Sequence, residues 1–395
     1  MSYTEEEARR LVVDAGIRLV KEGLTARTWG NISARISDSE FIITPSGMAY
    51  ESLRPGDLVR CRIEDCSYEG EIKPSSEKWI HADAYRLRSD VDFIIHTHQP
   101  CASAVSVRGH AVTVNVRGAE ELLGSFVPCA GYGISSTKKL RHEVEQVVKK
   151  YPRHSVFLMR SHGTFVLAKS EEDAFRKARM LEEVCENEIE WAGGKTPFFD
   201  EHNCHQPYQI PDYGSSIRSG RRMRVWENGR ETEYHIGELP QNASPVVLLH
   251  EAVYRADRSI SCILHNTAED VAAYSAAGKT LPPYLDDLAQ VAGTDIRCVR
   301  MADLSPKKII SGLRGRNAVL IRYGGALTTG RTRADAEAVG MILEKACKAA
   351  IYDTADSRHP HHYLGKADAL LQRMFYQKSY SKRIGQSHGK KTDGR

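Results

Sequence analysis

The first part of the chain alternates between helical spacing of its apolar residues and short strand-like runs. Thr4 and Glu7 form a capping box, and apolar residues then recur every three or four positions, which predicts an amphipathic helix over 4–23. The apolar run at 41–43 and the alternating stretch at 57–63 predict strands. The N-terminal region therefore contains both types of element.

The same alternation continues over the next hundred residues. The predicted elements are a helix over 76–87, a strand over 92–98, two strands over 156–159 and 164–168 around a tight turn, and a helix that Ser170 caps and that runs to about Ala192. Strands interleaved with helices are typical of a sheet that is covered by helices. We therefore expect an α/β domain.

The pattern then recurs along the chain. Residues 81–86 (HADAYR) return as 250–255 (HEAVYR), displaced by 169 positions, and the strand-like run 93–96 faces 262–265 at the same displacement. Because this displacement is about the length of a domain, duplication explains it better than a solenoid does. The sequence therefore predicts two tandem α/β domains.

The boundary between the copies is expected in a proline-containing stretch over 195–242, where Asn228-Gly229 is typical of a hairpin turn. The predicted parts are a catalytic domain over 1–210, a degenerate second domain over 211–357, and a C-terminal extension over 358–395 that ends in a basic, disordered tail.

Composition narrows the class of protein. The chain has 395 residues, of which 41% are hydrophobic and 27% charged, as in an ordinary globular protein, and no apolar run is long enough to span a membrane. The acidic N-terminus does not resemble an export signal. Nine cysteines without a Cys-x-x-Cys pair favour reduced thiols, so we expect a cytoplasmic protein.

The net charge of +4 comes from the C-terminal end. Residues 376–395 carry a net charge of +5, which leaves the remaining chain at −1. A basic tail can bind nucleic acid or an anionic membrane, but a tail of this Gly/Ser/Lys composition is more often a solvated disordered end. We therefore expect neither a membrane nor a nucleic acid as the partner.

A metal site is the sharpest chemical prediction of the first copy. His96 and His98 lie two positions apart on a predicted strand, so their side chains share one face. His162 in a Gly-bearing turn and Glu77 at a helix start can complete a site for Zn²⁺, or for Mn²⁺, Fe²⁺ or Co²⁺. The alternative for the His-x-His pair is two half-exposed strand histidines.

The second copy serves as an internal control for this site. Val246 replaces Glu77, and Thr267 and Gly324 replace two of the histidines, so that His265 alone persists, at the position of His96. Residues needed only for folding would be kept in both copies. His81/His250 and Tyr85/Tyr254 are kept in both and are interpreted as structural.

Three short polar turns of the first copy suit a phosphate group. They are 28–31, 44–47 and 74–76, and the last directly precedes a helix, whose free N–H groups and dipole attract anions. A plain N-cap is the alternative interpretation of Ser75 and Ser76. Because the second copy lacks the first two turns together with the metal ligands, the two features are expected to act jointly.

Together these residues resemble those of a known family. The chain is similar to the class II aldolase/adducin family in five ordered motifs within residues 5–195, namely Gly30-Asn31, Thr44-Pro45-Ser46-Gly47, Pro74-Ser75-Ser76-Glu77, His96-Thr97-His98 and Ser161-His162-Gly163. The second copy resembles this family only weakly.

The resemblance implies two tandem α/β/α three-layer domains, the second degenerate. It implies Zn²⁺ held by Glu77, His96, His98 and His162, with Glu77 also moving protons, and a homo-oligomeric assembly. The residues implied for binding of the substrate phosphate are Gly30, Asn31, Ser46, Gly47, Ser75 and Ser76.

The implied reaction is that of a lyase of carbohydrate metabolism. A zinc-dependent aldolase would cleave a ketose 1-phosphate into dihydroxyacetone phosphate and an aldehyde through a zinc-stabilised enediolate. Glutamate at position 77 favours the aldolase branch, and Tyr132 is a candidate for the second proton-transferring group. Epimerases, dehydratases and decarboxylases of sugar phosphates use the same chemistry and remain alternatives, as does a non-catalytic adducin-like scaffold.

Overall fold

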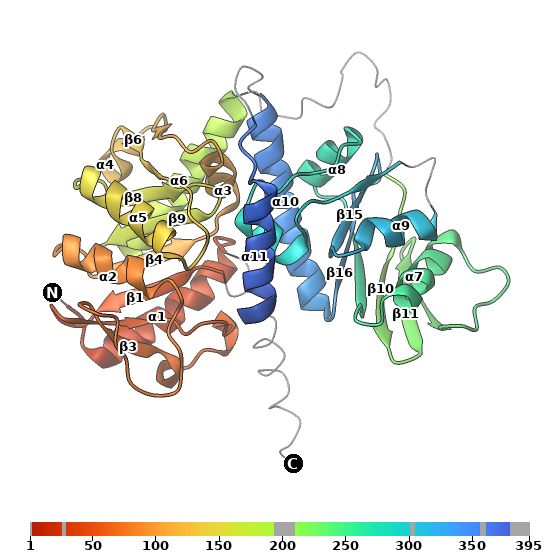
Figure 1. Cartoon of the computed structure of the whole chain (residues 1–395), viewed down its shortest axis with the longest axis horizontal. Helices are drawn as coiled ribbons and strands as arrows, with labels where there is room; N and C mark the ends of the chain where they lie inside the picture. The colour runs from red at the N-terminus through yellow and green to blue at the C-terminus, as the bar shows by residue number, and fades with distance from the viewer. Residues whose placement is uncertain (1, 26–28, 193–209, 301–304, 356–360, 380–395) are drawn as a thin grey trace. The chain divides into compact units, whose positions relative to one another are not determined.

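The structure of the chain is a computed structural model, and it describes residues 2–25, 29–192, 210–300, 305–355 and 361–379. The chain divides into two compact units (Figure 1). Unit 1 comprises residues 1–192 and 374–395, and unit 2 comprises residues 193–373. Each unit is described by itself.

Unit 1 is built around one sheet of seven strands. Its strands are β1 (Asn31–Arg35), β2 (Glu40–Ile43), β3 (Val59–Arg62), β4 (Phe93–Thr97), β7 (Cys129–Ala130), β8 (Val156–Met159) and β9 (Gly163–Ala168). They follow the order β3-β2-β1-β4-β9-β8-β7, and all neighbours are antiparallel except β7 and β8. A small second sheet pairs β5 (Val112–Thr113) with β6 (Phe126–Val127).

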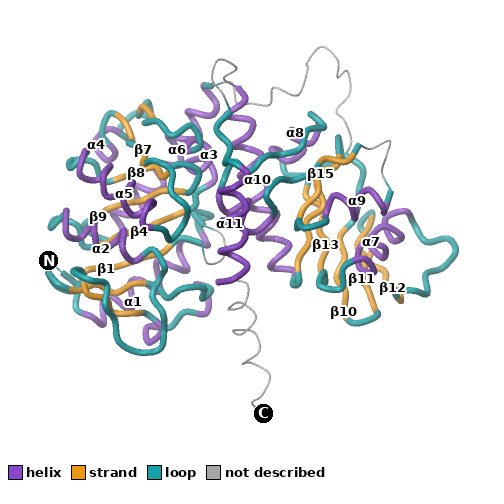
Figure 2. The backbone as a smooth tube through the Cα atoms, viewed as in Figure 1, coloured by secondary structure: helices purple, strands orange, loops and turns teal. Residues whose placement is uncertain are grey.

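Helices cover this sheet (Figure 2). They are α1 (Glu5–Lys21), α2 (Lys78–Leu87), α3 (Pro100–Ser106), α4 (Glu120–Leu123), α5 (Lys138–Lys150) and α6 (Glu171–Trp191), with the short helices η1 (Tyr50–Ser52) and η2 (Pro55–Asp57). α2 packs on α5, whereas α3 packs on α6, and α1 contacts β1 and β2. Unit 1 is therefore a mixed α/β domain.

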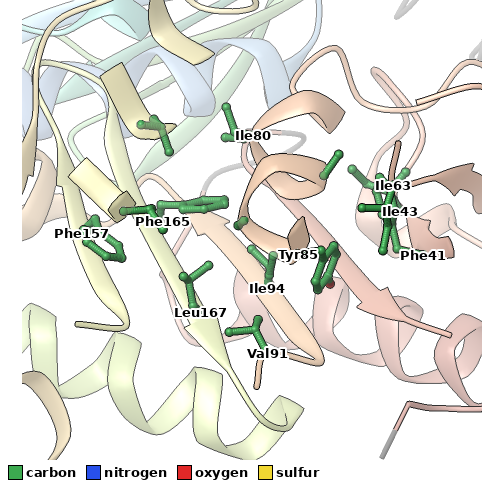
Figure 3. Packing of buried hydrophobic residues seen from close by; sticks show 14 of the residues in the cluster. Phe41, Ile43, Ile63, Ile80, Tyr85, Val91, Ile94, Phe157, Phe165 and Leu167 are labelled. Atoms are coloured by element: carbon green, nitrogen blue, oxygen red, sulfur yellow. The ribbon is translucent and has the colours of Figure 1, made fainter. Parts of the chain in front are cut away.

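The core of unit 1 joins the sheet to α2 and α5 (Figure 3). Ile80 and Tyr85 of α2 meet Phe41, Ile94 and Phe165 of the sheet. Each of these side chains is nearly excluded from solvent, and burial of one such side chain contributes about 1.5–3 kcal/mol. This packing fixes α2 on the face of β4 toward which residues 94 and 96 point, so the first turn of α2 lies beside the end of β4.

Unit 2 repeats this architecture. Its elements are β10 (Ser215–Ser219), β11 (Arg222–Glu227), β12 (Arg230–His235), α7 (Pro245–Ala256), β13 (Cys262–Asn266), α8 (Glu269–Ala276), the π-helix η3 (Leu288–Ala292), β14 (Cys298–Val299), α9 (Pro306–Leu313), β15 (Ala318–Ile321), β16 (Ala326–Gly330) and α10 (Arg333–Ala355). The strand order β12-β11-β10-β13-β16-β15-β14 corresponds strand for strand to that of unit 1, and β14 and β15 are again the parallel pair. The predicted tandem of two related α/β domains is confirmed.

Strand registers place equivalent residues of the two units. His96 pairs with Phe165 in unit 1, and His265 pairs with Leu327 in unit 2. Ser33 pairs with Ile94, and Ser216 pairs with Ile263. Position 96 is therefore equivalent to 265, as the displacement of 169 positions predicts, and the strand pairing also makes position 33 equivalent to 216.

The units differ where the second strand of the sheet meets the third. In unit 2, β11 and β12 are joined by the two-residue turn Asn228-Gly229, with both residues at positive φ. In unit 1 the connection runs from residue 44 to residue 58 and contains the turn 44–47. One of the predicted phosphate turns is thus an insertion that the hairpin of unit 2 lacks.

Most predicted element boundaries lie close to the observed ones. The capping box of Thr4 and Glu7 is present, and α1 begins at Glu5 and ends at Lys21. α2 begins at Lys78, two residues later than the predicted start, with Glu77 at its N-cap.

The predicted C-terminal extension contains the helix α11 (Lys366–Ser379), and the rest of the basic tail, residues 380–395, lies outside the described residues. None of the helices within the described ranges combines the length and the apolar composition that crossing a bilayer requires.

Candidate metal centre

Three histidines and one glutamate meet at the end of β4. His96 belongs to β4 and His98 follows that strand directly. His162 lies in the turn between β8 and β9, and Glu77 precedes the first residue of α2. The structure therefore brings together all four residues that the sequence singled out as ligands.

His96 contacts the other three side chains. The Nε2 atom of His96 is 3.2 Å from Nε2 of His98 and 3.0 Å from Nε2 of His162. Glu77 Oε2 lies 3.4 Å from His96 Nε2, and Glu77 Oε1 lies 3.4 Å from His162 Nε2. Three ring nitrogens and a carboxylate thus converge on one small volume.

The protonation state of His96 is set by its backbone partner. Its Nδ1–H donates to the carbonyl of Thr164 at 2.7 Å, so Nε2 keeps its lone pair and faces the other two rings. His96 is fully buried, and burial lowers the pKa of its imidazole well below the ordinary value. A neutral imidazole with an inward lone pair is the form that binds a cation.

Glu77 is 8% exposed and remains ionised. Burial alone would raise the pKa of its carboxyl, but His162, His96 and a hydrogen bond from Asn31 together hold that pKa well below its usual range. A carboxylate therefore faces the ring nitrogens of His96 and His162.

Glycines allow the strands to approach closely at this point. A Cβ atom on Gly163 would lie 2.3 Å from the carbonyl oxygen of Thr97, and one on Gly30 would lie 2.3 Å from that of His96. Gly30 also has φ +86°, a conformation that favours glycine. Any side chain at either position would displace the backbone that carries the histidines.

Two of the predicted phosphate turns lie side by side. Pro45 and Pro74 form an isolated β-bridge. The N–H of Ser46 donates to the carbonyl of Lys73, and the N–H of Ser75 donates to that of Thr44, both at 2.9 Å. Gly47 has φ +77°. Ser46, Gly47, Ser75 and Ser76 are thus gathered next to Glu77, whose N–H donates to Ser75 Oγ at 3.3 Å.

Asn31 is placed differently from the other predicted phosphate-binding residues. Its Nδ2 donates to Glu77 Oε2 at 3.1 Å, and its Oδ1 accepts from Nε2 of His81. The side-chain amide is therefore engaged with protein groups. A role of Asn31 in phosphate binding stays a prediction.

The loop before α5 supplies residues that the sequence did not single out. Ser135 Oγ is 3.3 Å from His162 Nδ1, and Ser136, at φ +64°, donates through Oγ to Ser76 Oγ at 2.7 Å. Ser136, Lys138 and Ser76 line a cavity of about 210 Å³ beside Glu77. Tyr132 belongs to the same loop, and its role in proton transfer stays a prediction.

In unit 2, the histidine at the corresponding position is engaged with neighbouring residues. His265 Nε2–H donates to the carbonyl of Gly324 at 2.8 Å, and the His265 ring packs edge-on against Tyr213 at 5.2 Å between centroids. Val246, at the Glu77 position, is a buried core residue. Unit 2 therefore has no equivalent of the four-residue cluster among its described residues.

The donor set of unit 1 fits a divalent cation. Three imidazoles with one carboxylate suit zinc and related first-row cations. His96, His98 and His162 are also the described residues whose ligand atoms gather closely enough to hold a metal ion. This arrangement is a buried cluster of candidate metal ligands on an α/β scaffold.

Comparison with known proteins places the chain in a family. Residues 10–189 and 220–351 match the model of the family described as "Class II Aldolase and Adducin N-terminal domain". The chain therefore belongs to the class II aldolase/adducin family, and each of its two units carries a copy of that domain.

The relatives include an enzyme named as a sugar-phosphate aldolase. A 5-deoxy-D-ribulose 1-phosphate aldolase of Bacillus thuringiensis serovar kurstaki is 32% identical over 178 residues, which span 45% of this chain and 82% of that protein. Among solved structures, an L-fuculose 1-phosphate aldolase (TM-score 0.45, 24% identity) covers 53% of this chain and 93% of its own. The L-fuculose 1-phosphate aldolase of Thermus thermophilus (TM-score 0.41, 25% identity) covers 47% and 95%.

Proposed function

We propose that unit 1 is a zinc-dependent aldolase that cleaves a ketose 1-phosphate into dihydroxyacetone phosphate and an aldehyde. The observation that carries the proposal is the buried contact of Glu77 with His96 and His162, 3.4 Å each, beside the paired turns 44–47 and 74–76. A cation site next to turns that suit a phosphate group would bind a substrate with both a carbonyl and a phosphate. We call the turns 44–47 and 74–76 the phosphate cradle. The relative named as a 5-deoxy-D-ribulose 1-phosphate aldolase supports the same substrate class.

His96, His98, His162 and Glu77 would hold the cation. When bound, a divalent cation supplies a Lewis acid that polarises the substrate carbonyl and stabilises negative charge on its oxygen. The Nδ1–H of His96 donates to Thr164, which keeps the ring in the orientation that this binding needs.

Glu77 is the proton carrier of the proposal. In the proposal, its buried carboxylate accepts a proton from the substrate and returns it. The cavity of about 210 Å³ that it lines gives a substrate access to this carboxylate.

The phosphate is bound away from the reacting bond. The hydroxyl groups of Ser46, Ser75 and Ser76 and the backbone N–H groups of Gly47 and Ser76 are the proposed donors, without a net charge, beside the start of α2. Binding energy from this group fixes the position of the substrate relative to Glu77. Because both turns belong to unit 1, the proposal assigns the complete cradle to that unit.

The test is an aldol-direction assay on zinc-loaded full-length protein. Dihydroxyacetone phosphate is mixed with lactaldehyde, glycolaldehyde, glyceraldehyde or acetaldehyde, and its consumption is followed. We expect aldehyde-dependent consumption that a chelator abolishes. Glu77→Gln should lower kcat by roughly 10²–10⁴-fold with little change in phosphate binding, because it removes the carboxylate that moves the proton and leaves the turns 44–47 and 74–76 intact.

Glu64→Gln is the matched control, since Glu64 is an exposed glutamate of the same unit. It should retain wild-type turnover. Zinc-loaded wild-type protein that consumes no dihydroxyacetone phosphate with any aldehyde would refute the aldolase assignment. Epimerisation or decarboxylation on the same centre would then be the reaction to assay.

A further inference from the structure

A chain of buried hydrogen bonds ends on the Glu77 carboxylate. Starting from the core, Tyr85 OH is 2.8 Å from Ser33 Oγ, and Ser33 Oγ is 2.7 Å from His81 Nδ1. His81 Nε2 then contacts Asn31 Oδ1, and Asn31 Nδ2 lies 3.1 Å from Glu77 Oε2. None of these five side chains is more than 8% exposed.

The direction of every bond in this chain can be deduced. The NH₂ group of Asn31 donates to Glu77 Oε2, so the amide oxygen faces His81. That oxygen needs a donor, which assigns the proton of the neutral His81 ring to Nε2. Nδ1 is then an acceptor, so Ser33 donates to it and Tyr85 donates to Ser33. All four hydrogen bonds point toward Glu77.

Unit 2 has the same hydrogen bonds from tyrosine to serine to histidine, but the histidine donates to a different partner. Tyr254 OH is 2.7 Å from Ser216 Oγ, which is 2.8 Å from His250 Nδ1. His250 Nε2–H then donates to the backbone carbonyl of Tyr213 at 2.9 Å instead of to a side chain. The hydrogen bonds among Tyr, Ser and His are therefore part of the fold that both units share. The bond from His81 to Asn31 is found in unit 1, the unit that also has Glu77.

We propose that His81 is a positioning residue for the metal centre: by donating from Nε2 to Asn31 it fixes the orientation of the Asn31 amide and thereby holds Glu77 Oε2 facing the three histidines. This inference rests on the proposed metal site of unit 1. Without the donor at His81 Nε2, the Asn31 amide can rotate by half a turn, which would place its oxygen against the carboxylate. Glu77 would then lose a hydrogen bond and gain a repulsion.

The test compares matched variants in the two units of the full-length protein. His81→Asn leaves an amide near the Nδ1 position, where it can keep Ser33 as a partner, but does not reach Asn31. His250→Asn makes the same change in unit 2. The Zn²⁺ dissociation constant is measured by competition with a coloured chelator, without substrate, and the melting temperature is measured in parallel.

We expect His81→Asn to raise the Zn²⁺ dissociation constant by about tenfold or more, the usual effect of losing an outer partner of a metal ligand. His250→Asn should lower the melting temperature to a similar extent and leave zinc affinity within about twofold of wild type, because its chain ends on a backbone carbonyl. His81→Gln, whose amide reaches the Nε2 position, should restore most of the affinity.

A folded His81→Asn variant with wild-type zinc affinity would overturn the inference. If that variant does not fold, Ser33→Ala and Ser216→Ala are the substitute pair, and equal zinc affinity of these two would overturn it as well. A wild-type protein that binds no zinc would instead refute the proposed function. The two failures are therefore distinguishable, because the affinity comparison needs no aldolase turnover.

Discussion

At the scale of single residues, the candidate site depends on glycines as well as on the histidines and Glu77. Gly163 is the first residue of β9 and directly follows His162, and its missing Cβ allows the carbonyl oxygen of Thr97 on β4 to approach. Gly325 holds the equivalent place in unit 2, where a Cβ would lie 2.4 Å from Asn266 O. Both units therefore need a glycine at this position to let the two strands approach. Among the described residues, only unit 1 has a cluster of candidate ligands beside it.

We predict that Gly163→Ala both destabilises the protein and weakens zinc binding. The new methyl must push β9 from β4, which should cost about 1–3 kcal/mol of unfolding free energy and displace the His96 ring, whose Cε1 would lie 3.3 Å from the added atom. We expect the Zn²⁺ dissociation constant to rise about tenfold. Denaturant unfolding and chelator competition measure the two effects.

Gly325→Ala is the control for that experiment. It introduces the same clash at φ +70° in unit 2 and should lose at least as much stability. Its zinc affinity should stay at the wild-type value. A loss of zinc affinity in both variants would indicate global destabilisation and contradict the local explanation.

At the scale of elements, α2 must be anchored, because Glu77 is its N-cap residue. Asp83 of α2 accepts two hydrogen bonds from Arg141 of α5, at 2.6 and 2.9 Å, and also pairs with Arg86. The Asp83 side chain is 3% exposed and the Arg141 side chain is 33% exposed. Arg141 in turn lies over the ring of Trp79, 4.1 Å from its centroid.

We therefore predict that Asp83→Asn lowers the free energy of unfolding by roughly 2 kcal/mol. A partner removed from a fully buried pair costs about 3–5 kcal/mol, and the partial exposure of Arg141 reduces this figure. Thermal or denaturant unfolding measures the loss. Asp90→Asn removes a carboxylate that is 52% exposed beside Arg88 and should cost less than about 0.5 kcal/mol. Equal losses in the two variants would contradict the anchoring role.

The elements that sequence reasoning found are those with a periodic apolar pattern. α1, α2, β4 and α6 follow such patterns, and the His-x-His spacing on β4 placed two ligands on one face. β1 was not predicted, because three of its five residues are polar, although all five are buried. Ser33 and Arg35 are tolerated there because His81 and backbone carbonyls satisfy them, and such partners are set by tertiary packing.

The site was predicted to a similar extent. The cluster of Glu77 and the three histidines could be predicted from residue type and spacing, and their role as metal ligands stays a prediction. The contacts of Ser135 and Ser136 could not, because their loop has no periodicity and its position depends on how α5 packs on α2. The pairing of Asn31 with His81 joins residues fifty positions apart and becomes visible only when α2 lies on β1.

At the scale of the whole molecule, comparing the two units separates the features that their common topology requires from those found in unit 1. Both keep the strand order, the parallel edge pair and the buried Tyr–Ser–His hydrogen bonds. Only unit 1 keeps the long β2–β3 connection and the four-residue cluster within the described residues. A ligand of the centre should therefore stabilise the protein through unit 1 alone.

This argument predicts the effect of zinc on unfolding of the full-length chain. Zinc at one hundred times its dissociation constant should stabilise the native state by about 2.7 kcal/mol, and a chelator should reverse the effect. The His96→Ala variant should lose the zinc-dependent rise in melting temperature because it removes a nitrogen that contacts both other rings and Glu77. His265→Ala changes the equivalent residue of unit 2, whose Nε2 bonds to Gly324, and should keep the full rise from a lower starting temperature. A zinc-dependent rise of the same size in His96→Ala would place the stabilising cation elsewhere in the chain.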